Sequence, residues 1–156
     1  MTTALDIVAI WLLAAAGIQL GTLWIMKLSI LPMLDSLGYG NYVTVCQLID
    51  MHLFHPIAVW SGVLAAGLGG WAAVATSSAG AAALFAAGSV GMVVVGIASE
   101  GVNRPIWRQI EKWSPQRVAN GWTGKRARWH VAHQVRTYAA IVAVAAYAVA
   151  LGVQAG

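Results

Sequence analysis

Long apolar stretches separated by short polar ones run through the whole sequence. A helix needs roughly 20 mainly apolar residues to cross the hydrocarbon of a bilayer. We therefore predict an all-α fold, an integral membrane four-helix bundle that forms a single domain over residues 1–156. The predicted transmembrane helices cover residues of about 5–31, 43–75, 80–99 and 126–153.

A polar segment rich in Trp and Arg separates the third and fourth predicted helices. Aromatic side chains of this kind concentrate where a membrane meets water. Its apolar positions Ile106, Trp107, Ile110 and Trp113 follow a helical spacing. The spacing predicts a short amphipathic interfacial helix that lies along the lipid headgroups.

The composition favours a membrane protein over a soluble one. The chain is 60% hydrophobic and 9% charged, whereas a soluble domain carries about 25% charged residues. A single cysteine, Cys46, excludes an intramolecular disulfide. The net charge of +4 does not indicate nucleic acid, because seven of the nine Lys and Arg residues fall in one stretch, 104–128.

This clustering of positive charge predicts the topology. Loops rich in Lys and Arg stay in the cytoplasm, so the loop 99–125 is expected there, with both termini on the opposite side. We expect the bacterial inner membrane as the location. The strongly polar residues of the predicted helices then all fall in the cytoplasmic half of the bundle, which indicates a site. These residues are Lys27, His52, His55, Glu100, Asn103, His130 and His133.

The four histidines form two pairs with an i,i+3 spacing, one pair on each of two predicted helices. Residues at this spacing share a helix face. The four metal-ligand candidates are therefore His52, His55, His130 and His133. Imidazole suits copper or iron, and Asp50, Glu100 and Gln134 are candidate partners that orient the rings or ligate the metal. Two alternatives stay open: bis-histidine haem, and hydrogen-bonded interfacial histidines, with Arg136 paired to Asp50 or Glu100.

Several short motifs resemble a known family. They are Leu31-Pro32, the run Cys46-Gln47-Leu48-Ile49-Asp50 through His55-Pro56, Asn103-Arg104-Pro105-Ile106, and Arg126-x-x-Trp129-x-x-x-His133-x-x-Arg136-Thr137. Together they cover most of the chain and resemble the anthrone oxygenase-like family of small four-helix membrane proteins. The most specific part is the asparagine after the third helix with the Trp, His and Arg-Thr of the fourth.

The resemblance implies an oxygenase that converts an anthrone to an anthraquinone with dioxygen as co-substrate. Asn103, Trp129, His133 and Arg136 match the motif positions. The chain departs from the family pattern at His52 and His130, which have no matching position, and at Asp50, near which relatives often have Asn. The extra histidines favour a metal-dependent member over a simple anthrone-oxidising role.

The sequence thus predicts a membrane-embedded oxidoreductase that acts on a lipophilic, aromatic or polyketide-type substrate. Arg136 and Asn103 would stabilise negative charge on a substrate oxygen, and without a metal His133 would be the general base. Asp50 completes the candidate catalytic set, and Trp129, Trp107 and Gln47 are the candidate substrate-binding residues. The alternatives are a bis-histidine haem electron-transfer protein and a non-catalytic membrane subunit or transporter. The expected partners are the lipophilic substrate and membrane lipid, without nucleic acid, and a homo-oligomer is compatible with the sequence.

Overall fold

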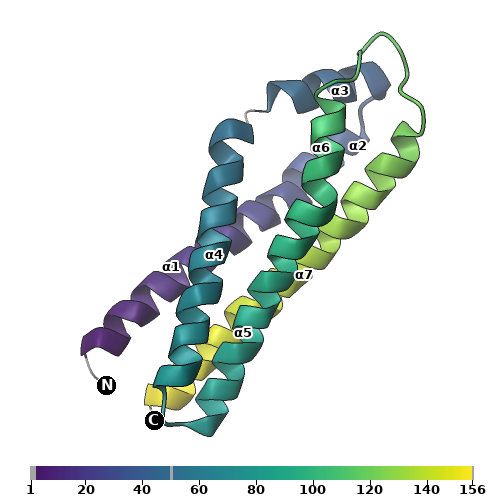
Figure 1. Cartoon of the computed structure of the whole chain (residues 1–156). Helices are drawn as coiled ribbons and strands as arrows, with labels where there is room; N and C mark the ends of the chain where they lie inside the picture. Colours follow the sequence, from purple (N-terminus) through teal and green to yellow (C-terminus); the bar gives the residue numbers. More distant parts are fainter. Residues whose placement is uncertain (1–2, 50, 156) are drawn as a thin grey trace.

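Four long helical rods lie side by side in the computed structural model, which describes residues 3–49 and 51–155 (Figure 1). Side-chain surroundings are described for residues 6–49 and 55–154. In chain order the elements are α1 (Thr3–Ile25), η1 (Met26–Ile30), α2 (Leu31–Asp35), α3 (Tyr39–Leu48), α4 (Met51–Ala75), α5 (Ala79–Ala98), η2 (Ser99–Asn103), α6 (Arg104–Ile110) and α7 (Trp122–Ala155). The described residues contain no strand, so the all-α prediction is confirmed for them.

Four helices are long and apolar enough to cross a membrane. They are Asp6–Asp35, His55–Ala75, Ala79–Ile110 and Trp122–Gln154. Helix α1 packs on α4 and α7, and α5 packs on the same two helices, so the four rods form a closed square. The beginning of α1 and the end of α7 lie at the same end of the bundle (Figure 1).

Two of the rods contain a single π turn that a proline follows. The amide of Leu31 donates to the carbonyl of Met26, and the amide of Arg104 donates to that of Ser99, each five residues back. Pro32 and Pro105 come directly after these two residues. A proline has no amide to donate and its ring collides with the preceding turn, so a widened turn before it lets the helix continue.

The short amphipathic helix expected at residues 106–113 is replaced by a different arrangement. Residues Arg104–Ile110 form α6, which prolongs the third rod through η2 instead of lying across the headgroups. The helix that crosses the end of the bundle is α3 (Figure 1). The second predicted helix, 43–75, is accordingly divided into α3 and α4, with an extended backbone at Ile49 between them.

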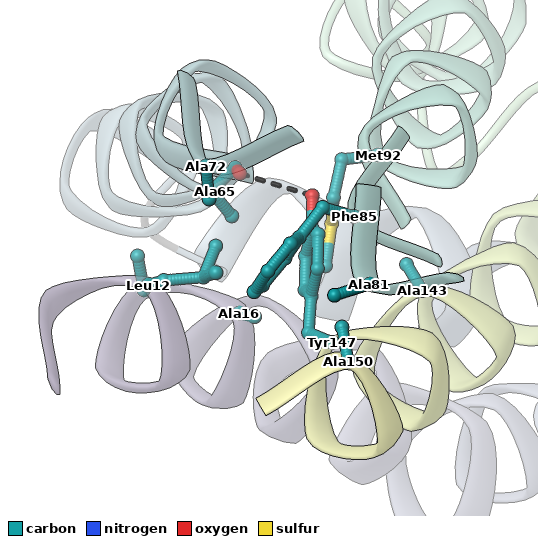
Figure 2. Close-up of a cluster of buried hydrophobic side chains, with 11 residues drawn as sticks. Leu12, Ala16, Ala65, Ala72, Ala81, Phe85, Met92, Ala143, Tyr147 and Ala150 are labelled. Atoms are coloured by element: carbon teal, nitrogen blue, oxygen red, sulfur yellow. Dashed lines mark hydrogen bonds between the residues drawn. The ribbon is translucent and has the colours of Figure 1, made fainter. Parts of the chain in front are cut away.

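The interior divides into two regions of different composition. At the end that holds the chain termini, small side chains let the helices approach closely, and Figure 2 shows this region around Tyr147. Its buried members are Leu12, Ala15, Ala16, Ala65, Ala72, Ala81, Phe85, Met92, Ala143, Tyr147 and Ala150. The other end is rich in large side chains from α2, α3, α6 and α7, among them Tyr42, Trp107 and Trp129.

Tyr147 is enclosed between two glycines on neighbouring helices. Its hydroxyl donates to the carbonyl of Ala65 at 3.0 Å (Figure 2). A Cβ placed on Gly69 would lie 2.5 Å from the Tyr147 ring and hydroxyl, and one placed on Gly88 would overlap the ring. A Cβ on Gly96, further along the same helix, meets nothing within 4 Å.

Candidate functional site

His133 lies at the centre of a buried polar network between the third and fourth rods. Its side chain is fully buried, and its Nδ1 accepts hydrogen bonds from the Arg136 guanidinium, with Nε at 3.1 Å and Nη2 at 2.8 Å. Arg136 also donates to Ser99 Oγ at 3.3 Å. The hydroxyl of Thr137 lies 3.3 Å from His133 Nε2 and donates to the His133 carbonyl at 2.8 Å. Both ring nitrogens therefore have partners.

The donor and acceptor chemistry of these partners sets the proton position on His133. A guanidinium only donates, so Nδ1 must be the unprotonated nitrogen and Nε2 must carry the hydrogen. The Thr137 hydroxyl uses its own hydrogen on the His133 carbonyl and is left to accept from Nε2. The network therefore holds His133 as a neutral imidazole in one tautomer.

The π turn η2 supplies the other side of this network. Ser99 begins the turn and Asn103 ends it, and both face Arg136. Asn103 is buried, and the amide orientation that satisfies its neighbours donates to the Trp129 carbonyl at 3.3 Å and accepts from Arg136 Nε and Nη2 at 3.2 Å. The predicted neighbours Asn103, His133 and Arg136 are thus brought together.

The Trp129 ring contacts both the buried His133 and the partly exposed His130. Its ring is stacked near the His133 ring with 6.2 Å between centroids, and it meets the His130 ring edge-on at 5.7 Å. On another side it packs against Trp107 at 6.1 Å. Trp129 and Trp107 are both almost fully buried, so they form the wall behind His130.

An open hollow lies on a different side of α7 from the buried His133 network. It has a volume of about 280 Å³ and is lined by Asp35, Thr123, Arg126, Ala127 and His130. The Asp35 carboxylate accepts from Arg126 Nη2 at 2.6 Å and lies 3.3 Å from His130 Nε2. The His130 side chain is 22% exposed, so its ring is accessible, unlike that of His133.

In this hollow Arg126 contacts one carboxylate and two aromatic rings. Its guanidinium lies over the rings of Tyr42 at 5.4 Å and Trp122 at 5.6 Å, opposite Asp35. Tyr42 is fully buried on α3, and this burial raises the pKa of its hydroxyl. One turn further along α3, burial raises the pKa of the Cys46 thiol to about 11. Helix α3 therefore presents buried, uncharged side chains on the side of Arg126 that Tyr42 contacts.

The structure places the other predicted residues away from His133. His55 Nε2 lies 3.3 Å from Glu100 Oε1, and Glu100 also binds Arg104. One alternative pairs Arg136 with Asp50 or Glu100; in the structure Arg136 binds His133, Ser99 and Asn103, and Glu100 is not among these partners.

Gln47 lies at the end of the third rod and does not line the hollow. Its amide nitrogen is within hydrogen-bonding distance of the carbonyls of Ile110, Glu111 and Trp113, at 2.9–3.2 Å. The last carbonyls of a helix have no partner within the helix. Gln47 therefore caps the third rod and attaches α3 to it.

The expected four-histidine metal site is not assembled from the described residues. Among them, no group of three or more His, Cys, Asp or Glu side chains lies close enough together to hold a metal ion. His55, His130 and His133 have separate partners, and a haem or metal ligand at His133 would have to displace Arg136 or Thr137. Asp50 and the side chain of His52 lie outside the described residues, so metal binding there stays a prediction.

The two charged residues that line the hollow beside His130, Asp35 and Arg126, were not among the predicted site residues. Asp35 lies just beyond the first predicted helix, 5–31, and Arg126 belongs to the stretch 104–128 that predicts the topology. The available signal was an acid at the end of one apolar stretch and a basic run at the start of another, both predicted on the cytoplasmic side. Comparison with protein-family models, with curated proteins and with solved structures found no match to this chain.

Proposed function

We propose that this chain is a membrane-embedded oxidoreductase of the oxygenase type, in which His130 removes a proton from a lipophilic aromatic substrate. The observation that carries the proposal is the hollow in which Asp35, Arg126 and His130 lie together, with the Trp129 ring packed against His130. The resemblance of the chain to anthrone oxygenase-like proteins supports the reaction type. The membrane placement rests on the four apolar helices.

His130 is better suited than His133 to be the base. Asp35 Oδ1 lies 3.3 Å from Nε2 of His130 without a hydrogen bond between them, so the carboxylate acts on the ring through its charge, and the proposal assigns proton uptake to Nδ1. A carboxylate in this position also stabilises the imidazolium that forms when the ring takes a proton. Arg126 supplies the positive charge that favours an enolate or phenolate oxygen on the substrate.

The oxidation then proceeds from the substrate anion and dioxygen. The C–H group of an anthrone-type substrate loses its proton to His130, and the electron pair stays on the substrate. The anion transfers one electron to dioxygen, and the two radicals combine into a peroxide bonded to that carbon. The peroxide takes up the proton from His130, and loss of water leaves a ketone at the carbon. One dioxygen is consumed and one water is released for each substrate.

In this proposal the buried His133 network positions the reactive side chains. Asn103 holds the backbone of Trp129, and the Trp129 ring contacts the His130 ring. Arg136 donates to both His133 and Asn103, and the His133 ring is stacked near the Trp129 ring. These contacts keep Asn103 and Trp129 in place. The roles first assigned to His133, Arg136 and Asn103 are therefore replaced by a supporting role, and substrate contact is assigned to the hollow.

Oxygen uptake by the detergent-purified protein with a hydroxylated anthrone tests this proposal. We expect His130→Ala to lower the initial rate about 100-fold, because a positioned general base contributes at least this factor. Asp35→Asn should lower it less and shift its pH dependence, because the imidazolium loses its carboxylate. Arg117→Gln, which removes a charge from the loop after α6, serves as a control and should leave the rate unchanged.

Full oxygen uptake by His130→Ala would contradict the assignment of the base. No uptake by the wild-type protein would contradict the oxygenase reaction itself. Elemental analysis and an absorption spectrum of the same samples test the separate prediction of copper, iron or haem at the histidines.

A further inference from the structure

A second hollow lies between the third and fourth rods, on the outer surface of the bundle. It has a volume of about 460 Å³. Its walls are Ala98 and Val102 on one side, and Val131, Ala132 and Val135 of α7 on the other. We call this hollow the α5–α7 groove. All of these side chains are small or β-branched, so the surface is apolar and narrow.

One charged residue, Arg128, lines the α5–α7 groove at its end nearest the beginning of α7. From Arg128 to Val135 the groove extends about 10 Å along the helix, at 1.5 Å per residue. Arg128 is exposed, and none of the ion pairs among the described residues includes it. The groove thus combines an exposed positive charge at one end with an apolar surface that leads away from it.

This combination differs from that of the hollow beside His130. There Arg126 is paired with Asp35, so an anion that approaches Arg126 also meets a carboxylate. The α5–α7 groove has no acidic side chain in its lining, so it presents a net positive charge to an approaching anion. Arg128 also belongs to the stretch 104–128, which contains seven of the nine Lys and Arg residues, and such a concentration of positive charge attracts anionic lipids.

We propose that the α5–α7 groove binds one anionic phospholipid. The phosphate pairs with Arg128, and one acyl chain lies along Val131 and Val135 over the floor made by Ala98 and Ala132. The direction from charge to apolar surface follows the direction from headgroup to bilayer interior in the proposed topology. The inference rests on the membrane placement of the proposed function and is independent of its oxidation chemistry.

A second copy of the chain fits this groove less well. Its occupant must supply a negative charge, and the chain has only five acidic residues. Asp35 and Glu100 are already paired with arginines, Asp6 is in the first turn of α1 at the end that holds the chain termini, and Glu111 is the one described acid that remains. A phospholipid supplies both the phosphate and the apolar chain.

Native mass spectrometry of the detergent-purified, delipidated full chain tests the proposal. The protein is titrated with phosphatidylglycerol and, separately, with phosphatidylcholine that has the same acyl chains. We expect one tightly bound phosphatidylglycerol and about fivefold weaker retention of it by Arg128→Gln, as expected for the loss of one favourable Lys or Arg charge near the lipid. Arg117→Gln removes the same charge from the loop and should retain the lipid as the wild type does.

Ala98→Leu provides a second variant, because it fills the groove without changing its charge. We expect it to weaken retention of both lipids while the protein stays monodisperse. Equal retention of the two lipids, or equal losses in Arg128→Gln and Arg117→Gln, would overturn the proposal. A dimer that Ala98→Leu dissociates would also overturn it, because the second copy would then be the occupant. Since every variant is first recovered from the membrane fraction, failure here is distinguishable from failure of the membrane placement.

Discussion

The imidazole of His133 has no free nitrogen in this structure, although its sequence context resembles a catalytic motif. Arg136 and Thr137 occupy the two ring nitrogens, and the side chain is fully buried. Arg136 is half-buried, and a guanidinium in such a position that loses an acceptor retains part of its desolvation cost. We therefore expect His133 to contribute mainly to the stability of the folded protein.

We predict that His133→Ala lowers the stability of the folded protein by about 2 kcal/mol, the typical cost of leaving a buried polar group without its partner. The thermal denaturation midpoint of the detergent-purified protein measures this loss. Gln134→Ala, one position along the same helix and exposed, should leave the midpoint unchanged. Equal midpoints for wild type and His133→Ala would show that the network contributes little.

Cys46 and Tyr42 give the fold a sensitivity to high pH. Burial raises the pKa of the Cys46 thiol from 9.0 to about 11, so the folded protein keeps the proton that the unfolded chain releases. This contribution is fully present below pH 9 and is lost as pH rises toward 11. We predict that stability falls over this range and that Cys46→Ala reduces the fall.

The same burial predicts how the thiol reacts. N-ethylmaleimide should not label Cys46 in the folded protein at pH 8, because the thiolate is the reactive form and the side chain is 1% exposed. After unfolding in sodium dodecyl sulfate it should be labelled completely. Rapid labelling of the folded protein would mean that α3 separates readily from the bundle.

The histidine pairs also show a limit of sequence reasoning. Residues three apart on a helix differ by about 60° around its axis, since each residue turns by about 100°. This angle is enough for His130 to face Asp35 while His133 faces the third rod. The spacing predicted that the two residues share a face, but it could not predict that they have different partners.

At the level of helices, the apolar stretches predicted the four rods correctly, but the two prolines do not mark the ends of helices. Pro32 and Pro105 lie beyond the predicted helices 5–31 and 80–99, yet both rods continue through them after a π turn. The spacing of Ile106, Trp107 and Ile110 is compatible with a helix along the headgroups and with a continued rod. Only the contacts with Trp129 and Gln47, which are distant in sequence, select the second arrangement.

The contact between Tyr147 and Gly88 fixes how closely the third and fourth rods approach. We predict that Gly88→Ala strongly lowers the thermal denaturation midpoint, because the new Cβ overlaps a rigid ring that neighbouring helices enclose. Gly96→Ala in the same helix should be tolerated, because its Cβ meets nothing within 4 Å. A second change, Tyr147→Leu, should partly restore the stability of Gly88→Ala. Equal midpoints for the two alanine variants would contradict the close approach.

For the whole molecule, the position of both chain ends at one end of the bundle fits the topology predicted from charge (Figure 1). The sequence could also predict that the polar residues gather at the other end. It could not predict which of them meet, because Asp35 and Arg126 are 91 residues apart and neither belongs to a periodic pattern.

The proposed orientation can be measured with two single substitutions. We predict that Gln154→Cys is labelled by a membrane-impermeant maleimide in spheroplasts, whereas Arg117→Cys is labelled only after the membrane is opened. The wild-type protein is the blank, because its buried Cys46 should not react. Labelling of Arg117→Cys in closed spheroplasts would reverse the topology.

The two π turns have a consequence for how chains of this fold can differ in length. A turn closed over five residues contains one residue more than an α-helical turn, so each π turn behaves as a single-residue insertion inside an otherwise regular helix. A variant that lacks Pro105 should tolerate the deletion of one residue from 99–103, since the shorter chain restores a continuous α-helix and leaves α6 facing as before. In an alignment of such chains, the gap would fall inside an apolar helix, and it would be accompanied by the loss of a proline two residues beyond.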